Sequence, residues 1–183
     1  MPIRLLTPDD APAYLALRRE MLVDSPLAFA SSPGDDRFRD EGVVREFVSH
    51  ARQAIVGAFA DDGGLVGSVG LRADHRAKMG HRSHVWGVYV SPPARGRGLG
   101  EAMMRRAVAV AAGWGGVTSV ALSVSARSRA AIALYERVGF RAWGVEPGAV
   151  VLDGACVDEV HMVMMLDKVR DAGGVTPSSR PGR

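Results

Sequence analysis

Residues 86–100 read WGVYVSPPARGRGLG, an apolar strand-like stretch followed by a glycine-rich turn and then by a helical pattern. Glycine has no side chain, so the backbone of such a turn can approach an anion closely. The unpaired amides at the start of the following helix carry partial positive charge. Arg95 and Arg97 add two fixed cations. The stretch therefore predicts a binding site for a pyrophosphate group.

Two common phosphate-binding motifs do not fit this turn. The dinucleotide-binding turn needs the spacing Gly-x-Gly-x-x-Gly and an acidic residue about 20 positions further on. Here the glycines stand at positions 96, 98 and 100, and Val120 occupies the position of the acid. A nucleoside triphosphate loop would end in Gly-Lys-Ser or Gly-Lys-Thr, whereas Gly100 is followed by Glu101 and Ala102. A nucleotide-phosphate binder of another type stays an alternative.

A second informative block lies further along the chain. The strand-like residues 120–124, VALSV, are followed by residues 128–140, SRAAIALYERVGF. Together with Arg95, Gly98 and Gly100, this block resembles the two signatures of the GNAT superfamily of N-acetyltransferases. The acetyl-coenzyme A (acetyl-CoA) loop of that family reads Arg or Gln, two residues, Gly, one residue, then Gly or Ala. The chain departs from the family at Ser128, where Asn is usual; serine can donate a hydrogen bond but has a shorter reach.

Hydrophobic periodicity divides the chain into strand-like and helical segments. We expect strands over residues 3–6, 54–60, 65–71, 84–90, 117–125, 140–145 and 157–166. We expect helices between Thr7 and Ser25, from about 41 to 51, from the glycine turn to Trp114, and over 128–138. This order resembles the GNAT fold, which implies a layered α/β (α+β) architecture. Its mixed, mostly antiparallel twisted sheet would have six to seven strands, flanked by about four helices.

Length and composition fit one enzyme domain followed by a basic tail. In a chain of 183 residues a single core buries roughly 70% of the unfolded surface. We assign a GNAT-like domain to residues 1–167 and expect residues 168–183 to be a disordered basic tail. This tail carries the whole formal charge of +3, which argues against a nucleic-acid surface on the folded body. Without a signal-peptide core or an apolar run of about 20 residues, we expect a cytoplasmic protein with no membrane contact.

The resemblance implies an N-acetyltransferase that moves an acetyl group from acetyl-CoA to a primary amine by direct attack in a ternary complex. In this family, free backbone groups of the strand before the glycine turn hold the pantetheine arm and polarise the thioester carbonyl. An oxyanion-hole donor of this kind is worth about 3 kcal/mol of the barrier. The cofactor-binding residues that the resemblance implies are Val88, Tyr89, Val90, Arg95, Gly96, Arg97, Gly98, Leu99, Gly100 and Ser128.

Tyr135 is the candidate general acid for the departing CoA thiolate, because the resemblance places it near the sulfur. A phenol with a pKa near 10 is protonated at neutral pH and can donate to a thiolate whose conjugate acid has a pKa of about 8.5. Ser128, Ala131 and Tyr135 lie three and four positions apart, so one helix face would present both polar groups. The alternative is that Tyr135 is an amphipathic core residue with its hydroxyl at the surface.

The base that deprotonates the amine has no fixed position in the family. Candidates are Glu159, Asp158, Glu41 and His84. Each of them also has an ordinary structural explanation, such as the first turn of a helix for Glu41. We name Glu159 as the catalytic candidate, and a water chain to solvent is the alternative.

The acceptor is expected to bind beside the loop of residues 25–40, which walls the substrate groove in similar proteins. Phe29, Asp35 and Asp36 could hold a cationic amine with an apolar body. The acceptor itself, a small-molecule or a peptide amine, is left open. Fold alone does not choose among acceptors.

Several further hypotheses follow from single features. The Ser128 substitution and the undetermined base allow a CoA-binding sensor or partner module without turnover. The group Asp74, His75, His81 and His84 lacks the ligand set of a closed zinc site, so no metal is expected. Cys156 has no partner in the chain and is expected to pack as a small apolar residue. The methionine-rich strand 162–165 could form a sheet-edge contact in a homodimer.

Overall fold

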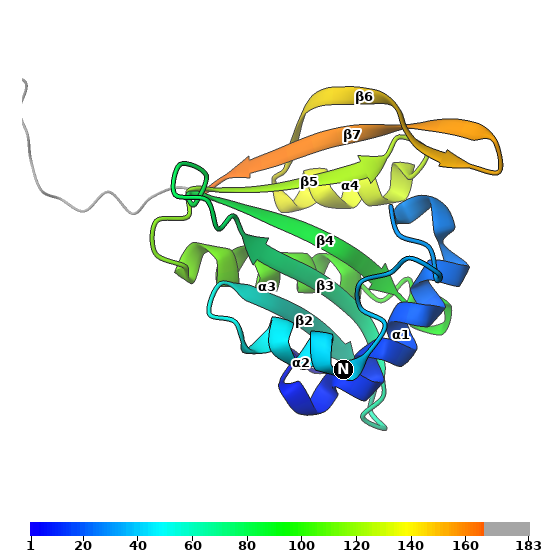
Figure 1. Cartoon of the computed structure of the whole chain (residues 1–183), viewed down its shortest axis with the longest axis vertical. Coiled ribbons are helices and arrows are strands. Elements are labelled where there is room, and N and C mark those ends of the chain that lie inside the picture. The colour runs from blue at the N-terminus through cyan, green and yellow to red at the C-terminus, as the bar shows by residue number, and fades with distance from the viewer. Residues whose placement is uncertain (167–183) are drawn as a thin grey trace, which may run out of the picture.

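The computed structural model describes residues 1–166, which form a seven-stranded sheet with helices on both of its faces (Figure 1). The strands are β1 (Ile3–Leu5), β2 (Gln53–Phe59), β3 (Leu65–Ala73), β4 (Arg82–Val90), β5 (Ser119–Ser125), β6 (Arg141–Leu152) and β7 (Ala155–Met165). The α-helices are α1 (Ala11–Asp24), α2 (Glu41–Ser49), α3 (Leu99–Gly113) and α4 (Arg129–Val138). Short 3-10 helices lie at η1 (Pro8–Asp10), η2 (Pro26–Ala28) and η3 (Pro92–Ala94).

The strand order in the sheet is β1-β2-β3-β4-β5-β7-β6. Strands β4 and β5 pair in parallel, and the other neighbours pair antiparallel. The parallel pair follows from the crossover through α3, because two parallel strands cannot be joined by a tight turn. The expected mixed, mostly antiparallel sheet with four α-helices is thus confirmed.

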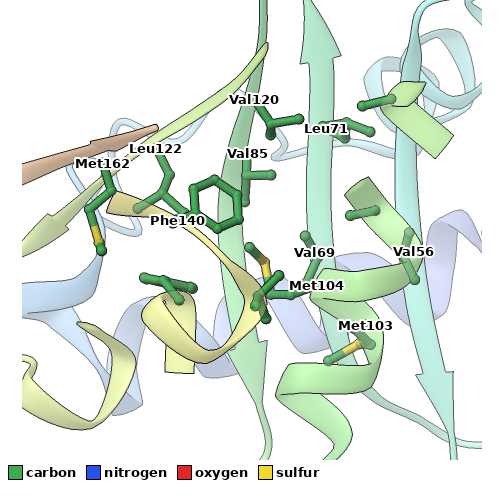
Figure 2. Close-up of a cluster of buried hydrophobic side chains, with 14 of the residues drawn as sticks. Val56, Val69, Leu71, Val85, Met103, Met104, Val120, Leu122, Phe140 and Met162 are labelled. Atoms are coloured by element: carbon green, nitrogen blue, oxygen red, sulfur yellow. The ribbon is translucent and has the colours of Figure 1, made fainter. Parts of the chain in front are cut away.

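The larger hydrophobic core lies between the sheet and the helices α3 and α4 (Figure 2). Met103 and Met104 of α3 are fully buried in it. They pack in a cluster with side chains of the sheet and of the α4–β6 connection, which are Val56, Val69, Leu71, Val85, Val120, Leu122, Phe140 and Met162. A second cluster, which includes Tyr14, Val44 and Ile55, forms where α1 and α2 cover the opposite face over β2 and β3. The sheet is therefore held from both sides in its β1–β4 half.

The β6–β7 hairpin is longer than the sequence predicts. Strand β6 runs to Leu152 rather than ending near Val145, and β7 begins at Ala155 rather than at Val157. Residues 146–148 lie within β6, where the pairing register shifts between Glu146 and Val150. A bulge absorbs Pro147 and Gly148 there, because a bulge can place residues outside the regular ladder.

The structure also corrects two expectations about the C-terminal part of the sheet. Strand β7 lies between β5 and β6 and is therefore not an edge strand; Met162 pairs with both neighbours, while Met164 and Met165 pair with β5 and extend past the end of the β6 ladder at Val163. Cys156 is exposed rather than packed, because it lies near the tip of the hairpin, beyond the main core. Residues 167–183, which include the tail expected to be disordered, lie outside the described residues. Within residues 1–166, no helix is both long and apolar enough to cross a membrane.

Candidate functional site

Strands β4 and β5 separate after a short paired stretch. Their register extends over Arg82–His84 and Ser119–Ala121, and beyond these residues the two strands no longer pair. A cavity of about 80 Å³ lies beside the opening, and we name it the small cavity. Its lining residues are Ala28, Val85, Trp86, Gly87, Val88, Leu122, Ser123, Val124, Ser128, Ala131 and Tyr135. Backbone groups of β4 on the side of β5 are thereby left free of the β4–β5 ladder, as the resemblance implies.

The separation coincides with an irregularity in β4. Gly87 has a left-handed backbone conformation, with φ of 61°, and the β3–β4 register shifts between Ser68 and Gly70. Such a bulge bends a strand and increases its twist. Gly70 is needed opposite the bulge, because a Cβ atom there would lie 2.3 Å from the Trp86 ring. The local sequence therefore turns β4 away from β5 at the level of Gly87.

The glycine turn leads directly into α3 at one end of this opening. Gly96 and Gly98 have φ of 77° and 74°, conformations that disfavour other residues, and Gly98 is the N-cap of α3. A Cβ atom at either position would meet nothing within 4 Å, so the turn is open on its outer side. Gly100 allows α3 to pack closely against α4, because a Cβ atom added at this position would lie 3.0 Å from the Leu134 side chain.

The two arginines of the turn differ in their contacts. The Arg95 guanidinium donates to the carbonyl of Val90 at 2.9 Å and to the carboxylate of Asp24, at the end of α1. Arg97 is exposed and forms no ion pair with any described residue. Arg95 therefore fixes the turn against the rest of the fold, while Arg97 is available to an incoming anion.

Helix α4 presents its N-terminal half to the small cavity. Ser128, Ala131 and Tyr135 all line it, so the three residues share the face that their spacing predicts. Ser128 is the N-cap of α4, yet its side chain makes no capping hydrogen bond. Tyr135 is 6% exposed, and burial raises the pKa of its phenol above the ordinary value. The hydroxyl thus stays protonated at neutral pH.

The three strand residues expected to bind the cofactor lie differently. Val88 lines the small cavity. Tyr89 points to the other side of the sheet, where its buried side chain donates a hydrogen bond to Glu20 of α1 at 3.0 Å. The carbonyl of Val90 already accepts from Arg95. Among these residues, only Val88 has its side chain in the lining of the opening.

A larger cavity of about 540 Å³ adjoins the small one, and we name it the large cavity. The two share residues of the opening, including Val85, Gly87 and Ser123. The further lining residues come from α1, the loop after η2 and five strands: Arg18, Phe29, Ala30, Ser31, Arg37, Phe38, Arg72, Arg82, His84, Ala121, Trp143, Glu159 and His161. The two cavities therefore meet at the separation of β4 and β5.

The loop of residues 25–40 walls the large cavity, but its acids do not have the expected role. Phe29 lines the cavity, as expected. Asp35 does not line it, because its side chain accepts a hydrogen bond from the Ser32 amide at 2.6 Å and closes a turn of the loop. Asp36 is buried in a two-point ion pair with Arg18, at 2.8 and 2.9 Å. Neither acid is therefore free to hold a cationic acceptor.

Of the four base candidates, Glu159 and His84 line the large cavity, and Asp158 and Glu41 do not. Asp158 accepts from the Gly148 amide at 2.8 Å, and Glu41 pairs with a neighbour on its own helix. Burial lowers the pKa of His84 below its ordinary value, and the nearby cations of Arg82 and Arg72 lower it further. His84 is therefore a neutral imidazole, able to accept a proton, near neutral pH.

The arginines of the large cavity are functional candidates that sequence reasoning missed. Arg72 stands directly opposite His84 in the β3–β4 ladder, and Arg82 lies two positions before His84 on β4. Residues in these relations share one face of a sheet. The alternation of residues along β4 places Arg82 and His84 on one face, but only the pairing of β3 with β4 shows that Arg72 lies on the same face beside them. Within residues 1–166, no group of three or more His, Cys, Asp or Glu side chains could hold a metal ion.

Comparison with known proteins agrees with this geometry. The model of the acetyltransferase (GNAT) family matches residues 16–140, which contain both the glycine turn and α4. The YwnH protein of Bacillus subtilis (strain 168), provisionally named a phosphinothricin acetyltransferase, is 28% identical over 71 residues. That match covers 39% of this chain and 43% of the relative, so it spans less than half of the relative's length.

Solved structures show the same fold over nearly the whole chain. One is a GNAT superfamily phosphinothricin acetyltransferase from Sinorhizobium meliloti, in complex with acetyl-CoA, with a TM-score of 0.81 at 20% identity. The match covers 98% of this chain and 95% of that protein's chain. A ribosomal-protein-alanine N-acetyltransferase from Brucella melitensis has a TM-score of 0.79 at 24% identity and covers 91% and 100%. With the family model matching more than half of its residues, this chain belongs to the acetyltransferase (GNAT) family.

Proposed function

We propose that the protein is an acetyl-CoA-dependent N-acetyltransferase acting on a primary amine. The observation that carries this proposal is the meeting of two cavities at the separation of β4 and β5. The small cavity lies beside β4 and α4, the glycine turn follows the end of β4 at the N-terminus of α3, and the large cavity is large enough for an acceptor. Two substrates entering from opposite sides would thus react at one place, which is what direct transfer requires.

The glycine turn would bind the pyrophosphate of acetyl-CoA. The first amides of α3 point out of the helix end, and the left-handed Gly96 and Gly98 leave no side chain in the way. Arg97 would add a charge-assisted contact. Leu99 is buried beneath the turn and anchors the helix end. Ser128 has an uncommitted hydroxyl that could donate to the pantetheine arm.

The acetyl group would be held where β4 turns away from β5. Free backbone groups near Gly87 and Val88 would accept or donate hydrogen bonds to the pantetheine arm and polarise the thioester carbonyl. The amine nitrogen would form a bond to the carbonyl carbon, and the carbon–sulfur bond would then break. Glu159 or His84 would take the proton from the amine, directly or through water, and Tyr135 would donate a proton to the leaving sulfur.

Two relatives support the choice of co-substrate and of reaction. The Sinorhizobium meliloti structure holds acetyl-CoA in the same fold. The structure of YncA from Salmonella typhimurium, 19% identical with a TM-score of 0.77, also holds acetyl-CoA as its cofactor. The names of the relatives describe acetylation of phosphinothricin and of a protein alanine. An amine acceptor is therefore the most economical choice for this chain.

The deciding experiment is calorimetric titration of acetyl-CoA into the wild-type protein and into Gly98→Glu. A side chain at φ of 74° costs about 1–2 kcal/mol of backbone strain, and its carboxylate would repel the pyrophosphate. We expect binding by the wild type and at least about a hundredfold weaker binding by the variant. Gly115→Glu is the matched control, because it adds the same charge at an unobstructed glycine without positive φ.

Thiol release from acetyl-CoA in the presence of a panel of amines then tests transfer. Release that depends on the amine would support the enzyme. Binding of acetyl-CoA without transfer to any amine would favour the alternative, a CoA-binding sensor or partner module. Absence of binding by the folded wild type would reject both, and competition by nucleotides would indicate a nucleotide-phosphate binder.

A further inference from the structure

The charges in the large cavity are unequal. Arg18 is neutralised by Asp36, with which it forms a buried ion pair. Of the remaining lining residues, Arg37, Arg72 and Arg82 are cations, while Glu159 alone is an acid. None of these three arginines has a carboxylate within 4.0 Å among the described residues. The lining of the cavity thus has more cations than acids, and no ion pair among the described residues neutralises these three arginines.

Two of these arginines come together on the floor of the cavity. Arg72 on β3 lies across from His84, and Arg82 lies on the same face of β4. Both guanidiniums are near His84, whose pKa is lowered first by burial and then by Arg82 and Arg72. Arg37 is placed differently, because its guanidinium lies over the rings of Phe38 and Phe47, 4.8 and 5.7 Å from their centroids. Arg72 and Arg82 are therefore the pair available to a ligand.

We propose that the acceptor amine carries an anionic group, a carboxylate or phosphonate, which Arg72 and Arg82 bind at the far end of the large cavity. This proposal rests on the proposed function, because it assigns the class of acceptor for the same site. Guanidinium groups suit carboxylates and phosphonates, which accept two parallel hydrogen bonds. A cationic acceptor of the kind expected from Asp35 and Asp36 would instead be repelled.

The position of the arginine pair also fixes where the anion lies relative to the amine. The reaction would occur near Gly87, three residues beyond His84 on β4, which is about 10 Å along a strand. The anion must therefore be several bonds from the nitrogen. Trp86, which lies between His84 and Gly87 on β4, and Phe29 of the loop also line the cavity, so apolar side chains are available to an alkyl chain of the acceptor.

Acetylation of three amines of equal length tests the proposal: 6-aminohexanoate, hexylamine and 1,6-diaminohexane. They have the same number of carbons and differ only at the sixth carbon, which is a carboxylate, a methyl group or a methylene that carries an ammonium group. At low ionic strength we expect kcat/KM to be about tenfold or more higher for 6-aminohexanoate than for hexylamine, and lowest for the diamine. An equal or higher value for hexylamine or for the diamine would overturn the proposal, while still showing an N-acetyltransferase.

Variants then identify the residues. Arg72→Gln combined with Arg82→Gln should lower the ratio of kcat/KM for 6-aminohexanoate to kcat/KM for hexylamine by about tenfold or more. Arg106→Gln on α3 is the control for the loss of an arginine charge as such, because it removes one such charge from an exposed residue that does not line the cavity. An equal loss for both amines in the double variant would overturn the assignment of the anion to this pair.

Binding of the two products separates failure of this inference from failure of the proposed function. Calorimetry in the presence of CoA would compare 6-acetamidohexanoate with N-hexylacetamide, without any turnover. Tighter binding of the anionic product, lost in the double variant, supports the arginine site even if no amine of the panel is acetylated. Equal binding of the two products overturns it, whether or not transfer occurs.

Discussion

The two cavities that meet beside β4 are built in different ways. The small cavity is lined by short stretches of chain, 85–88 and 122–124, and by the first turns of α4. The large cavity is lined by side chains from α1, the following loop and five strands. The first depends on backbone geometry, and the second depends on individual charged and aromatic side chains. The proposed acetyl-CoA side of the site thus has a local origin in the sequence, while the proposed acceptor side depends on the tertiary structure.

The largest effect should come from the ion pair that supports the wall of the large cavity. Arg18 and Asp36 have side chains only 6% and 4% exposed. Asp36→Ala would leave a buried guanidinium without its partner, which costs about 3–5 kcal/mol of unfolding free energy. Urea denaturation measures this loss.

Asp35→Ala is the matched control, because the exposed neighbour only closes a turn with Ser32. It should cost about 1 kcal/mol or less. A double change, Arg18→Met with Asp36→Leu, should recover most of the stability lost in Asp36→Ala, because no charge stays buried alone. If Asp36→Ala costs no more than Asp35→Ala, the ion pair does not support the cavity wall.

The next effect belongs to the small cavity and to turnover rather than to stability. Tyr135→Phe should lower kcat by about a hundredfold, the usual contribution of a general acid, with the affinity for acetyl-CoA unchanged. Because the pKa of Tyr135 is raised, this residue should cause no alkaline decline in rate below a pH of about 10. Steady-state kinetics across pH checks both statements.

Tyr89→Phe, on strand β4, is the matched control for Tyr135→Phe on helix α4. It removes a buried hydroxyl that donates to Glu20, and should cost about 1 kcal/mol of stability without changing kcat. Full activity of Tyr135→Phe at every pH would remove Tyr135 as the acid. A fall in kcat of the same size in both variants would point to a general loss of packing instead.

The same contrast explains how far the sequence could predict the molecule. The glycine turn and the spacing of Ser128, Ala131 and Tyr135 are local features, so the elements and the lining of the small cavity follow from them. The fold could be predicted for the same reason, because the hydrophobic periodicity that distinguishes strands from helices is a property of neighbouring residues. The extension of β6 did not follow, since Pro147 and Gly148 give a turn signal that only pairing with β7 overrides.

The large cavity needed information that no single segment contains. Asp35 and Asp36 are adjacent in sequence, yet one is exposed and the other meets Arg18, eighteen residues earlier. Arg72 and Arg82 approach one ligand position only because β3 pairs with β4 in a particular register. Long-range pairing is therefore the reason that we propose an anionic acceptor, where the sequence alone led us to expect a cationic one.

A smaller effect should separate His84 from Glu159 as the base. If His84 accepts the proton, it acts while neutral, and its lowered pKa extends activity toward acid pH. Arg82→Gln removes a neighbouring cation, which raises the pKa of His84. The acid limb of the pH–rate profile should therefore shift to higher pH. With hexylamine as the acceptor, the rate near pH 6, expressed as a fraction of the plateau rate, should be about twofold lower in the variant than in the wild type.

The surrounding charges define the controls. The groups that act on His84 are Arg82 on its own strand, Arg72 on β3 and Asp74 after β3. Arg106→Gln, remote from them, should leave the pH profile unchanged. An unshifted profile in Arg82→Gln, together with a profile that changes in Glu159→Gln, would assign the base to Glu159.

The smallest expected effect comes from the ion pair that links helix α1 to the glycine turn. Asp24, at the end of α1, pairs with Arg95 of the glycine turn, and both side chains are partly exposed. Exposed ion pairs contribute little to stability, so Asp24→Asn should leave the unfolding transition unchanged. It would release the Arg95 guanidinium toward the pyrophosphate, and the affinity for acetyl-CoA should rise about two- to threefold at low salt.

The direction of this small change decides what Arg95 does. Asp9→Asn is the matched control, because that carboxylate is almost fully exposed and far from the turn in sequence. A rise in affinity confined to Asp24→Asn, and abolished by salt, would mean that Arg95 meets the phosphates once it is free. A fall would mean that Arg95 serves acetyl-CoA by holding the turn in place through Asp24 and Val90, which leaves Arg97 and the α3 amides as the phosphate ligands.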